Sequence, residues 1–466
     1  MYLTKILRLG VTIVTALYGS MVFGQNKADR PNIIYVLADD LGYADLGCFG
    51  QKKIETPHID RMAKDGILLS NHYAGTTVCA PSRCALMTGL HTGHTDIRGN
   101  KANQPEGQYP ISAETRTVAE CLKEAGYKTA LVGKWGLGYP GSEGDPLKKG
   151  FDHFYGYNCQ RHAHTHYPDY LWENDMHIDI PENKNGKRKV HSHELLTNNA
   201  LEFIRQNKEE AFFLYLSYVV PHAELAAPKE FMDQYKGKYQ ETPHPGGHYH
   251  KQDSPKAAYA AMVSMMDSDV GRIRSLIEKM GLAENTIIIF TSDNGPHLES
   301  GNDPDFFDSN GIYRGYKRDL YEGGIRSPFV AWWPGKIKAG TKSDHISAFW
   351  DFMPTACELA GVEAPEGLDG ISYVPALLGQ EQAEHDYLYW EFHEKAGKQA
   401  IRKGKWKALR LGAKKDKSAD IQLFDLSLDP GEKQNVADQH PKLVKEMKHL
   451  FANSRTPVEA FPFGDQ

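Results

Sequence analysis

The chain has 466 residues, of which 40% are hydrophobic and 24% are charged, and its formal net charge is -6. This length exceeds that of one ordinary domain, so we expect a large unit and a smaller one. The mild acidity and the lack of a basic stripe argue against a nucleic-acid partner. An anionic substrate would instead have to be held by a local group of basic side chains.

The N-terminus has the pattern of an export signal. Lys5 and Arg8 precede an apolar stretch over residues 9–23, and small residues follow near Gly24. Thr and Ser interrupt the stretch, which is short for a transmembrane helix; an uncleaved anchor is the alternative. We expect residues 1–24 to be a signal peptide, the mature protein to be periplasmic or secreted, and no stable membrane insertion. The six cysteines imply no disulfide framework.

Short apolar runs alternate with helical patterns along the first 300 residues, which is typical of a mainly parallel sheet covered on both faces. The predicted strands are Asn32–Ala38, Thr129–Gly133, Ala211–Val220 and Thr286–Ser292. The predicted helices between them are Thr117–Ala125, His193–Gln206 and Pro255–Met280. We therefore expect an α/β fold.

Residues 79–83 read Cys-Ala-Pro-Ser-Arg. We expect Cys79 in a turn, Pro81 at the first position of a helix, and that helix to end at Gly89. The cysteine would then lie at a helix N-terminus, where backbone N–H groups favour an anion. Taken alone, Cys79 would equally suit a small buried apolar position.

After Gly379 the pattern changes to short strands and turns, within residues 387–393, 400–411 and 421–427, followed by a helix over Pro441–Asn453. This pattern predicts a small antiparallel sheet packed with one helix, which could cover the mouth of the site. We accordingly expect a catalytic domain over residues 25–380 and a C-terminal α+β subdomain over residues 381–466.

Polar side chains follow each predicted strand of the large sheet at the point where the strand ends. These side chains are Asp39 and Asp40, Lys134, His222, and Asp293 with Asn294. In an open α/β sheet, ligands bind in the crevice beyond the carboxyl ends of the strands. We therefore expect all of these side chains to converge on one site.

The acidic residues at these strand ends suggest a metal ion. Asp39 and Asp40 are adjacent like charges beside a buried strand, and holding both ionised is costly without a cation. Asp293 and Asn294 add further oxygen ligands, and such a set favours Ca²⁺, with Mg²⁺ next. Either pair alone would also fit a solvated turn or a helix cap.

Together these motifs resemble the formylglycine-dependent sulfatases of the alkaline phosphatase superfamily, among them bacterial arylsulfatases and carbohydrate sulfatases. The matching segments are PNIIYVLADDLG (31–42), CAPSR (79–83), GKWGLG (133–138), the Pro-His pair at 221 and 222, TSDNG (291–295), KRDLYEGGIRSP (317–328) and LFDLSLDPGEKQN (423–435). The resemblance covers the chain from about Pro31 to its C-terminus. It implies a large mixed, mainly parallel sheet sandwiched by helices.

The resemblance also implies a modified residue and a cofactor. Cys79 would be oxidised to formylglycine (3-oxoalanine) by a formylglycine-generating enzyme. A divalent cation, Ca²⁺ or Mg²⁺, would be bound by residue 79 together with Asp39, Asp40, Asp293 and Asn294. One hydroxyl of the aldehyde hydrate would attack the sulfate ester to give a sulfated enzyme, and the other would release sulfate.

In the same resemblance, Arg83 would orient and stabilise the hydrated aldehyde. Lys134, His222 and Lys317 would surround the sulfate and oppose the negative charge that develops as the S–O bond breaks. Two positions depart from the family pattern. Gly136 stands where many sulfatases have a histidine, which leaves His222 and His297 as candidates for acid and base, and Leu90 replaces an arginine.

The segment from Cys159 to Tyr170 is rich in histidine and contains Arg161, His162 and His164. Such a segment could bind a transition metal or form a solvated loop. We interpret it as a wall that faces the substrate, because Arg, His and aromatic side chains suit a sulfated sugar. Arg161, His162, His164 and His297 are the expected sugar contacts.

Three functional hypotheses follow. The first is an exported sulfatase that hydrolyses sulfate esters of a glycan, with a galactose- or hexosamine-type sugar. The second keeps the fold and the formylglycine but acts on a phosphate or phosphonate ester. The third, suggested by Gly136, is an inactive sulfatase-like protein that binds glycans.

Overall fold

The computed structural model describes residues 30–416 and 419–463. The predicted signal peptide, residues 1–24, lies outside these ranges. Among the described residues, no helix has the length and apolar character needed to cross a membrane.

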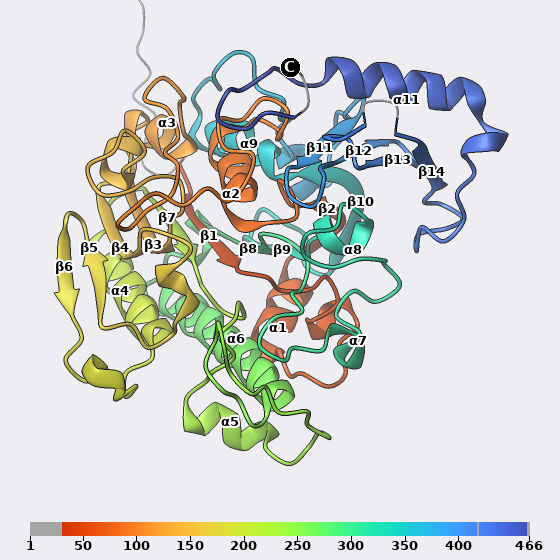
Figure 1. Cartoon of the computed structure of the whole chain (residues 1–466). Coiled ribbons are helices and arrows are strands. Elements are labelled where there is room, and N and C mark those ends of the chain that lie inside the picture. Colours follow the sequence, from red (N-terminus) through yellow and green to blue (C-terminus); the bar gives the residue numbers. More distant parts are fainter. Residues whose placement is uncertain (1–29, 417–418, 464–466) are drawn as a thin grey trace, which may run out of the picture.

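A ten-stranded mixed sheet forms the centre of the molecule (Figure 1). Its strands, in spatial order, are β10 (Thr341–Ala348), β2 (Ile67–Tyr73), β9 (Phe329–Trp332), β8 (Thr286–Ser292), β1 (Asn32–Ala38), β7 (Phe212–Ser217), β3 (Lys128–Lys134), β4 (His153–Tyr157), β5 (Tyr170–Glu173) and β6 (Met176–Asp179). The strands from β8 to β4 are parallel, whereas β9 is antiparallel to both of its neighbours. The predicted fold class is therefore confirmed.

Helices cover both faces of this sheet (Figure 1). Along β1, Ile34 and Val36 pack into the hydrophobic core on one face, and Ile33 and Tyr35 into the core on the other. The first face is covered by α1 (Pro57–Asp65), α4 (Ser192–Gln206) and α6 (Pro255–Lys279). The second is covered by α2 (Cys79–Thr88), α3 (Val118–Glu124) and α9 (Phe352–Ala360). A strand buried on both faces reads as a continuous apolar run.

Helix α2 corrects one sequence-based expectation, because Cys79 is its first residue rather than part of a preceding turn. The N-cap is Val78 in extended conformation, so Pro81 falls within the first turn. Backbone N–H groups there have no acceptor inside the helix, and a proline is therefore tolerated. The helix ends as expected at Gly89, whose φ of 71° is left-handed.

A second, antiparallel sheet consists of β11 (Leu388–Phe392), β12 (Lys398–Lys403), β13 (Trp406–Leu411) and β14 (Ile421–Asp425). Helix α11 (Pro441–Asn453) packs against it through Met447 and Phe451. The expected small sheet with one helix is thus present. The shorter helices α5 (Lys229–Tyr235), α7 (Pro304–Phe307), α8 (Glu322–Ile325) and α10 (Val374–Leu377) lie within connections of the large unit.

Candidate active site

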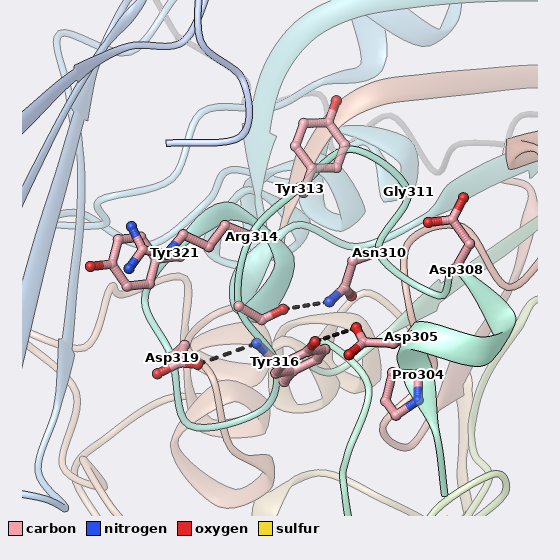
Figure 2. A pocket seen from close by; sticks show the side chains of 11 residues that line it. Pro304, Asp305, Asp308, Asn310, Gly311, Tyr313, Arg314, Tyr316, Asp319 and Tyr321 are labelled. Carbon is pink, nitrogen blue, oxygen red and sulfur yellow. Dashed lines mark hydrogen bonds between the residues drawn. The ribbon is translucent and has the colours of Figure 1, made fainter. Parts of the chain in front are cut away.

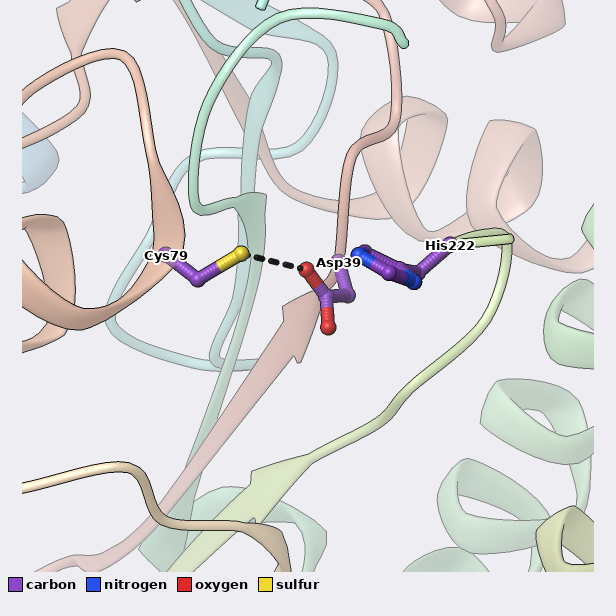
Figure 3. A group of neighbouring side chains, drawn as sticks. All are labelled: Asp39, Cys79 and His222. Carbon is purple, nitrogen blue, oxygen red and sulfur yellow. Dashed lines mark hydrogen bonds between the residues drawn. The ribbon is translucent and has the colours of Figure 1, made fainter. Parts of the chain in front are cut away.

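The polar residues at the strand ends meet in space, because β8, β1, β7 and β3 are parallel neighbours in the sheet. A cavity of about 450 Å³ opens beside them. It is lined by Cys79, Lys134, His164, His222 and Lys317, together with residues from several loops. Figure 3 shows the Asp39 carboxylate lying between the side chains of Cys79 and His222.

Three buried carboxylates crowd together at this edge of the sheet. Oxygens of Asp39, Asp40 and Asp293 lie within 4.8 Å of one another, and each residue is 0% exposed. The Asp40 backbone N–H donates to Asp293 Oδ1 (3.0 Å) from a left-handed backbone, with φ 65° at Asp40. Burial, and then the negative charge of Asp39, raise the pKa of Asp293 to about 7. A cation would relieve this repulsion.

Asn294 completes an oxygen-rich set of ligands. Its Nδ2 donates to Asp40 Oδ1 (2.7 Å) and to the carbonyl of Gly295 (2.9 Å). Its Oδ1 is buried and has no hydrogen-bond partner within the described part of the chain. An orphaned amide oxygen beside three carboxylates suits a hard cation such as Ca²⁺. The residues present therefore fit a divalent metal ion.

The thiol of Cys79 is held in its protonated form. Its Sγ donates to Asp39 Oδ1 (3.3 Å), and the residue is 3% exposed. Burial, and then the charge of Asp39, raise the pKa of Cys79 well above its usual value. Because a thiolate is the reactive form of cysteine, the unmodified residue is a poor nucleophile here.

Arg83 links the buried carboxylates of the site to the ends of two strands. Its Nη2 and Nε donate to Asp293 Oδ2 at 2.8 and 3.2 Å, and Nη2 lies 3.5 Å from Asp39 Oδ2. Its Nη1 donates to the carbonyl of Lys134 (3.1 Å) and to the hydroxyl of Ser217. One side chain thereby fixes the carboxylates against the ends of β3 and β7.

Two lysines bring positive charge to the cavity. Lys134 Nζ lies 2.5 Å from Asp39 Oδ2, and Lys317 Nζ lies 2.7 Å from Asp40 Oδ2. Burial alone would lower the pKa of both lysines, but the neighbouring carboxylates outweigh it and raise each pKa. Both side chains are therefore cationic and suited to an anionic substrate.

Two histidines line the cavity together with these lysines. The rings of His164 and His222 stack with centroids 5.3 Å apart, and His222 Nε2 lies 3.6 Å from Asp40 Oδ2. Burial, followed by the charge of Lys317, lowers the pKa of His222 well below its usual value. Burial and Lys134 lower the pKa of His164 to about 4. Both rings are therefore neutral near pH 7.

The residues predicted to contact the sugar fall in different places. Arg161 and His164 line the cavity beside Cys79. His162 lines an adjoining cavity of about 430 Å³, where its Nδ1 lies 3.4 Å from Glu106 Oε1. His297 is 0% exposed, and its Nε2 pairs with the carbonyl of Pro221 (3.1 Å). The structure thus brings two of these four residues to the site.

Several lining residues were not among the predicted site residues. They include Asn100, Gln160, Glu299, Arg318 and Glu394, of which Gln160 and Arg318 lie within segments that the sequence had marked. Glu394 lies in the turn between β11 and β12, and its Oε2 is 3.4 Å from Arg318 Nε. The C-terminal sheet therefore contributes directly to the wall of the cavity.

A separate cavity of about 470 Å³ lies within the loop region of residues 304–321 (Figure 2). Tyr316 and Asp305 hydrogen bond across it, and Asn310 donates to the carbonyl of Gly315. None of its lining residues also lines the cavity at Cys79. Its lining residues include Tyr313, Arg314, Gly315 and Tyr316, which directly precede Lys317 in the chain.

Comparison with known proteins agrees with this geometry. The sulfatase family model matches residues 31–362, and the model of the N-sulphoglucosamine sulphohydrolase C-terminal region matches residues 311–456. N-acetylgalactosamine-6-sulfatase of Canis lupus familiaris is 33% identical over 380 residues, which are 77% of this chain and 68% of the relative. N-acetylgalactosamine-6-O-sulfatase of Bacteroides thetaiotaomicron is 31% identical over 507 residues, with 93% of this chain and 94% of the relative covered.

Among solved structures, Ps i-CgsB in complex with k-i-k-neocarrahexaose superimposes with a TM-score of 0.79 at 29% identity. The superposition covers 92% of this chain and 94% of that protein. The match extends over both sheets rather than over the large sheet alone. The chain therefore belongs to the sulfatase family and is a sulfuric ester hydrolase.

Proposed function

We propose that this enzyme hydrolyses sulfate esters of a glycan and uses formylglycine at position 79 with Ca²⁺ as its metal. The observation that carries the proposal is the cavity at the strand ends. Residue 79, two cationic lysines and two neutral histidines line it, and three buried carboxylates lie next to residue 79 and the lysines. No single element of this set is specific, but their combination suits the binding and cleavage of a sulfate ester.

The state of Cys79 supports its conversion. A buried thiol whose pKa is raised beside Asp39 cannot act as a thiolate near pH 7. Formylglycine would supply hydroxyl groups at the same position, one as nucleophile and one for the release of sulfate. Asp39 lies within hydrogen-bonding distance of residue 79 and is placed to accept the proton of such a hydroxyl.

The lysines, the histidines and the acidic residues would have separate roles in binding and cleaving the ester. Lys134 and Lys317 are placed to bind the sulfate oxygens and to stabilise the charge that develops on them. The negative charge of a bound sulfate ester would favour the protonated form of His164 or His222, and the protonated ring would then donate its proton to the leaving alcohol. Asp39, Asp40, Asp293 and Asn294 would hold Ca²⁺, which supplies Lewis-acid polarisation when bound.

A sulfated galactose- or hexosamine-type sugar is the proposed substrate, with N-acetylgalactosamine 6-sulfate as the first candidate. Two relatives are named as N-acetylgalactosamine-6-sulfatases, and Ps i-CgsB was crystallised in complex with k-i-k-neocarrahexaose. A cavity of about 450 Å³ has the size typical of small-molecule sites. Arg161 and Glu394 on its walls could bind sugar hydroxyls and charged substituents.

The test is turnover of a panel of sulfated mono- and oligosaccharides by protein produced in a host that makes formylglycine. We expect sulfate release from a galactose- or hexosamine-type sugar, and an aldehyde in the peptide that contains residue 79. Faster turnover of matched phosphate or phosphonate esters would replace this proposal with the second hypothesis. Glycan binding without turnover would favour the third. We also propose that the protein is exported, which cell fractionation tests.

A further inference from the structure

Gly136 leaves a space in the cavity wall that another side chain fills. The segments after β3 and β4 run side by side, and the Gly136 N–H donates to the carbonyl of Asn158 (3.0 Å). This pairing brings Gln160 against Gly136. A Cβ atom on Gly136 would lie 2.1 Å from Gln160 Nε2 and 3.1 Å from its Cδ. A side chain at position 136 would therefore displace the Gln160 carboxamide from its present place.

The Gln160 carboxamide is buried without partners. The residue is 7% exposed, yet neither its Nε2 nor its Oε1 has a hydrogen-bond partner in the part of the chain that the structure describes. Most buried polar atoms in native proteins are hydrogen bonded, and an unpaired amide at this depth is costly. Gln160 lines the same cavity as Cys79 and Lys134. Its missing partners are therefore to be sought in a ligand.

We propose that Gln160 binds the sulfated end of the substrate from the position that Gly136 leaves open. The inference rests on the proposed function and names one more substrate-binding residue for it. Sulfate oxygens only accept hydrogen bonds, so the donor among the two free groups, Nε2, is the one that binds the sulfate. Gln160 Oε1 only accepts, and it is free to bind a sugar hydroxyl or an acetamido N–H next to the ester.

A carboxamide differs from an imidazole in one respect that matters for the reaction. It donates a hydrogen bond but does not release or take up a proton near neutral pH. Gln160 therefore contributes binding and orientation, and proton transfer to the leaving oxygen falls to the histidines of the cavity, His164 and His222. Gln160 Oε1 can be paired only by a sugar that carries a hydrogen-bond donor next to the sulfate. Gln160 would therefore favour such a sugar over one that lacks the donor, and it is in this sense a specificity determinant.

The first test compares Gln160→Ala and Gln160→Glu with the wild type in binding inorganic sulfate and in kcat/KM on the best sulfated sugar. Loss of one hydrogen bond to a charged group predicts sulfate binding and kcat/KM weaker by roughly 10- to 100-fold in Gln160→Ala. Gln160→Glu keeps the shape but replaces the donor by a negative charge, so we expect a larger loss. Gln382→Ala, a glutamine outside the cavity, serves as the matched control.

The second test asks whether residues 136 and 160 share one space, with thermal unfolding as the measurement. Gly136→Ala is made in the wild type and in Gln160→Ala. The strain from the left-handed φ of 83° at Gly136 is common to both backgrounds, so the difference between them reports the collision with Gln160. We expect Gly136→Ala to lower Tm more when Gln160 is present. Equal effects in the two backgrounds would show that the two positions do not compete.

Unchanged sulfate affinity and kcat/KM in both Gln160 variants would overturn the inference. Failure of the proposed function gives a different result. If the wild type releases sulfate from no sugar, yet binds inorganic sulfate in a manner that depends on Gln160, the inference about Gln160 stands and the proposed reaction falls.

Discussion

Two buried clusters of charged side chains differ in whether the chain itself supplies partners for the polar atoms in and around them. The cluster at the active site joins Asp39, Asp40 and Asp293 to Lys134, Lys317 and Arg83. The second cluster lies where the large unit meets the C-terminal sheet. There Glu322 Oε1 pairs with Lys407 Nζ (2.9 Å), Glu322 Oε2 with Arg326 Nη1 (2.8 Å), and Lys407 with Glu432 (3.1 Å).

The difference lies in what each cluster faces. The junction cluster is buried, and its four members join α8 and Arg326 to β13 and to the segment that follows β14. The active-site cluster opens into a cavity, and next to it the Asn294 Oδ1 and the Gln160 carboxamide lack partners among the described residues. Buried charge alone therefore does not identify a functional site in this molecule. Buried charge beside a cavity with unsatisfied polar atoms does.

Replacing residue 79 should have the largest effect. Cys79→Ala removes the precursor of the nucleophile, and we expect kcat/KM to fall by at least about 10⁴-fold with little change in Tm. Steady-state sulfate release and thermal unfolding measure the two quantities. Cys84→Ala, in the same helix but outside the cavity lining, is the matched control and should retain activity. Activity that survives in Cys79→Ala would place the reaction at another site.

Removal of the metal should come next. Chelation with EGTA is expected to lower kcat about 100-fold or more, because a Lewis acid contributes several kcal/mol to the stabilisation of the transition state. Added Ca²⁺ should restore activity and raise Tm, since it binds only the folded cluster. Asp293→Asn should weaken this rise in Tm, while Glu322→Gln should keep it. A Ca²⁺ response that Asp293→Asn leaves intact would contradict the proposed ligand set.

The junction cluster should affect stability rather than catalysis. Glu322→Gln leaves Lys407 and Arg326 without their shared carboxylate, and breaking a buried ion pair costs about 3 kcal/mol or more in the free energy of unfolding. We expect a lower midpoint in urea with nearly unchanged kcat/KM at temperatures where the protein is folded. A large loss of kcat/KM without loss of stability would erase the distinction between the two clusters.

Lowering the pH should destabilise the protein through the same junction cluster, with a smaller effect than the Glu322→Gln substitution. Burial alone would raise the pKa of Glu322, but Lys407 and Arg326 outweigh it and lower the pKa to about 2. A carboxyl group with a lowered pKa stabilises the folded state above its unfolded pKa of about 4.3 and loses this contribution as the pH falls towards 2. Unfolding free energies measured from pH 5 to pH 2 should therefore fall more steeply in the wild type than in Glu322→Gln. Parallel curves would contradict this pKa shift.

The smallest effect is expected at the cavity wall. Arg161→Ala removes one positive charge that faces the sugar but not the reacting ester, so KM should rise about tenfold while kcat changes little. Michaelis–Menten analysis on the best sulfated sugar separates the two parameters. Arg205→Ala, an exposed arginine on α4, provides the comparison. A fall in kcat at constant KM would instead give Arg161 a role in the chemical step.

Four neighbouring strands in the middle of the sheet, β8, β1, β7 and β3, were predicted because they are buried on both faces and read as apolar runs. β1 and β8 have the predicted bounds, and α11 begins and ends where expected. The strands at the sheet edges carry weaker signals. In β10 the sequence TKSDHISA alternates between intermediate and exposed side chains before its last two residues, so no apolar run marks it. Its place in the sheet depends on long-range pairing with β2.

The site was predictable to the extent that local motifs encode it. Asp39 and Asp293 directly follow β1 and β8, and Lys134 is the last residue of β3, so the topology of a parallel sheet is enough to bring them together. Gln160 lies in the histidine-rich segment that was expected to face the substrate, but it was not singled out there. Glu394 lies on a loop, and its approach depends on tertiary packing that no local pattern records. The burial of His297 has the same origin, since its environment includes the carbonyl of Pro221, a residue far away in sequence.

The turn between β11 and β12 carries Glu394 to the cavity wall, whereas the residues proposed for the reaction all come from the large unit. One residue of the cavity wall is thus encoded apart from the residues that are proposed to break the ester. Short insertions or exchanges in this hairpin would alter one without rebuilding the other. For protein engineering, the sequence of this turn can be varied to change the glycan preference while the catalytic residues stay the same.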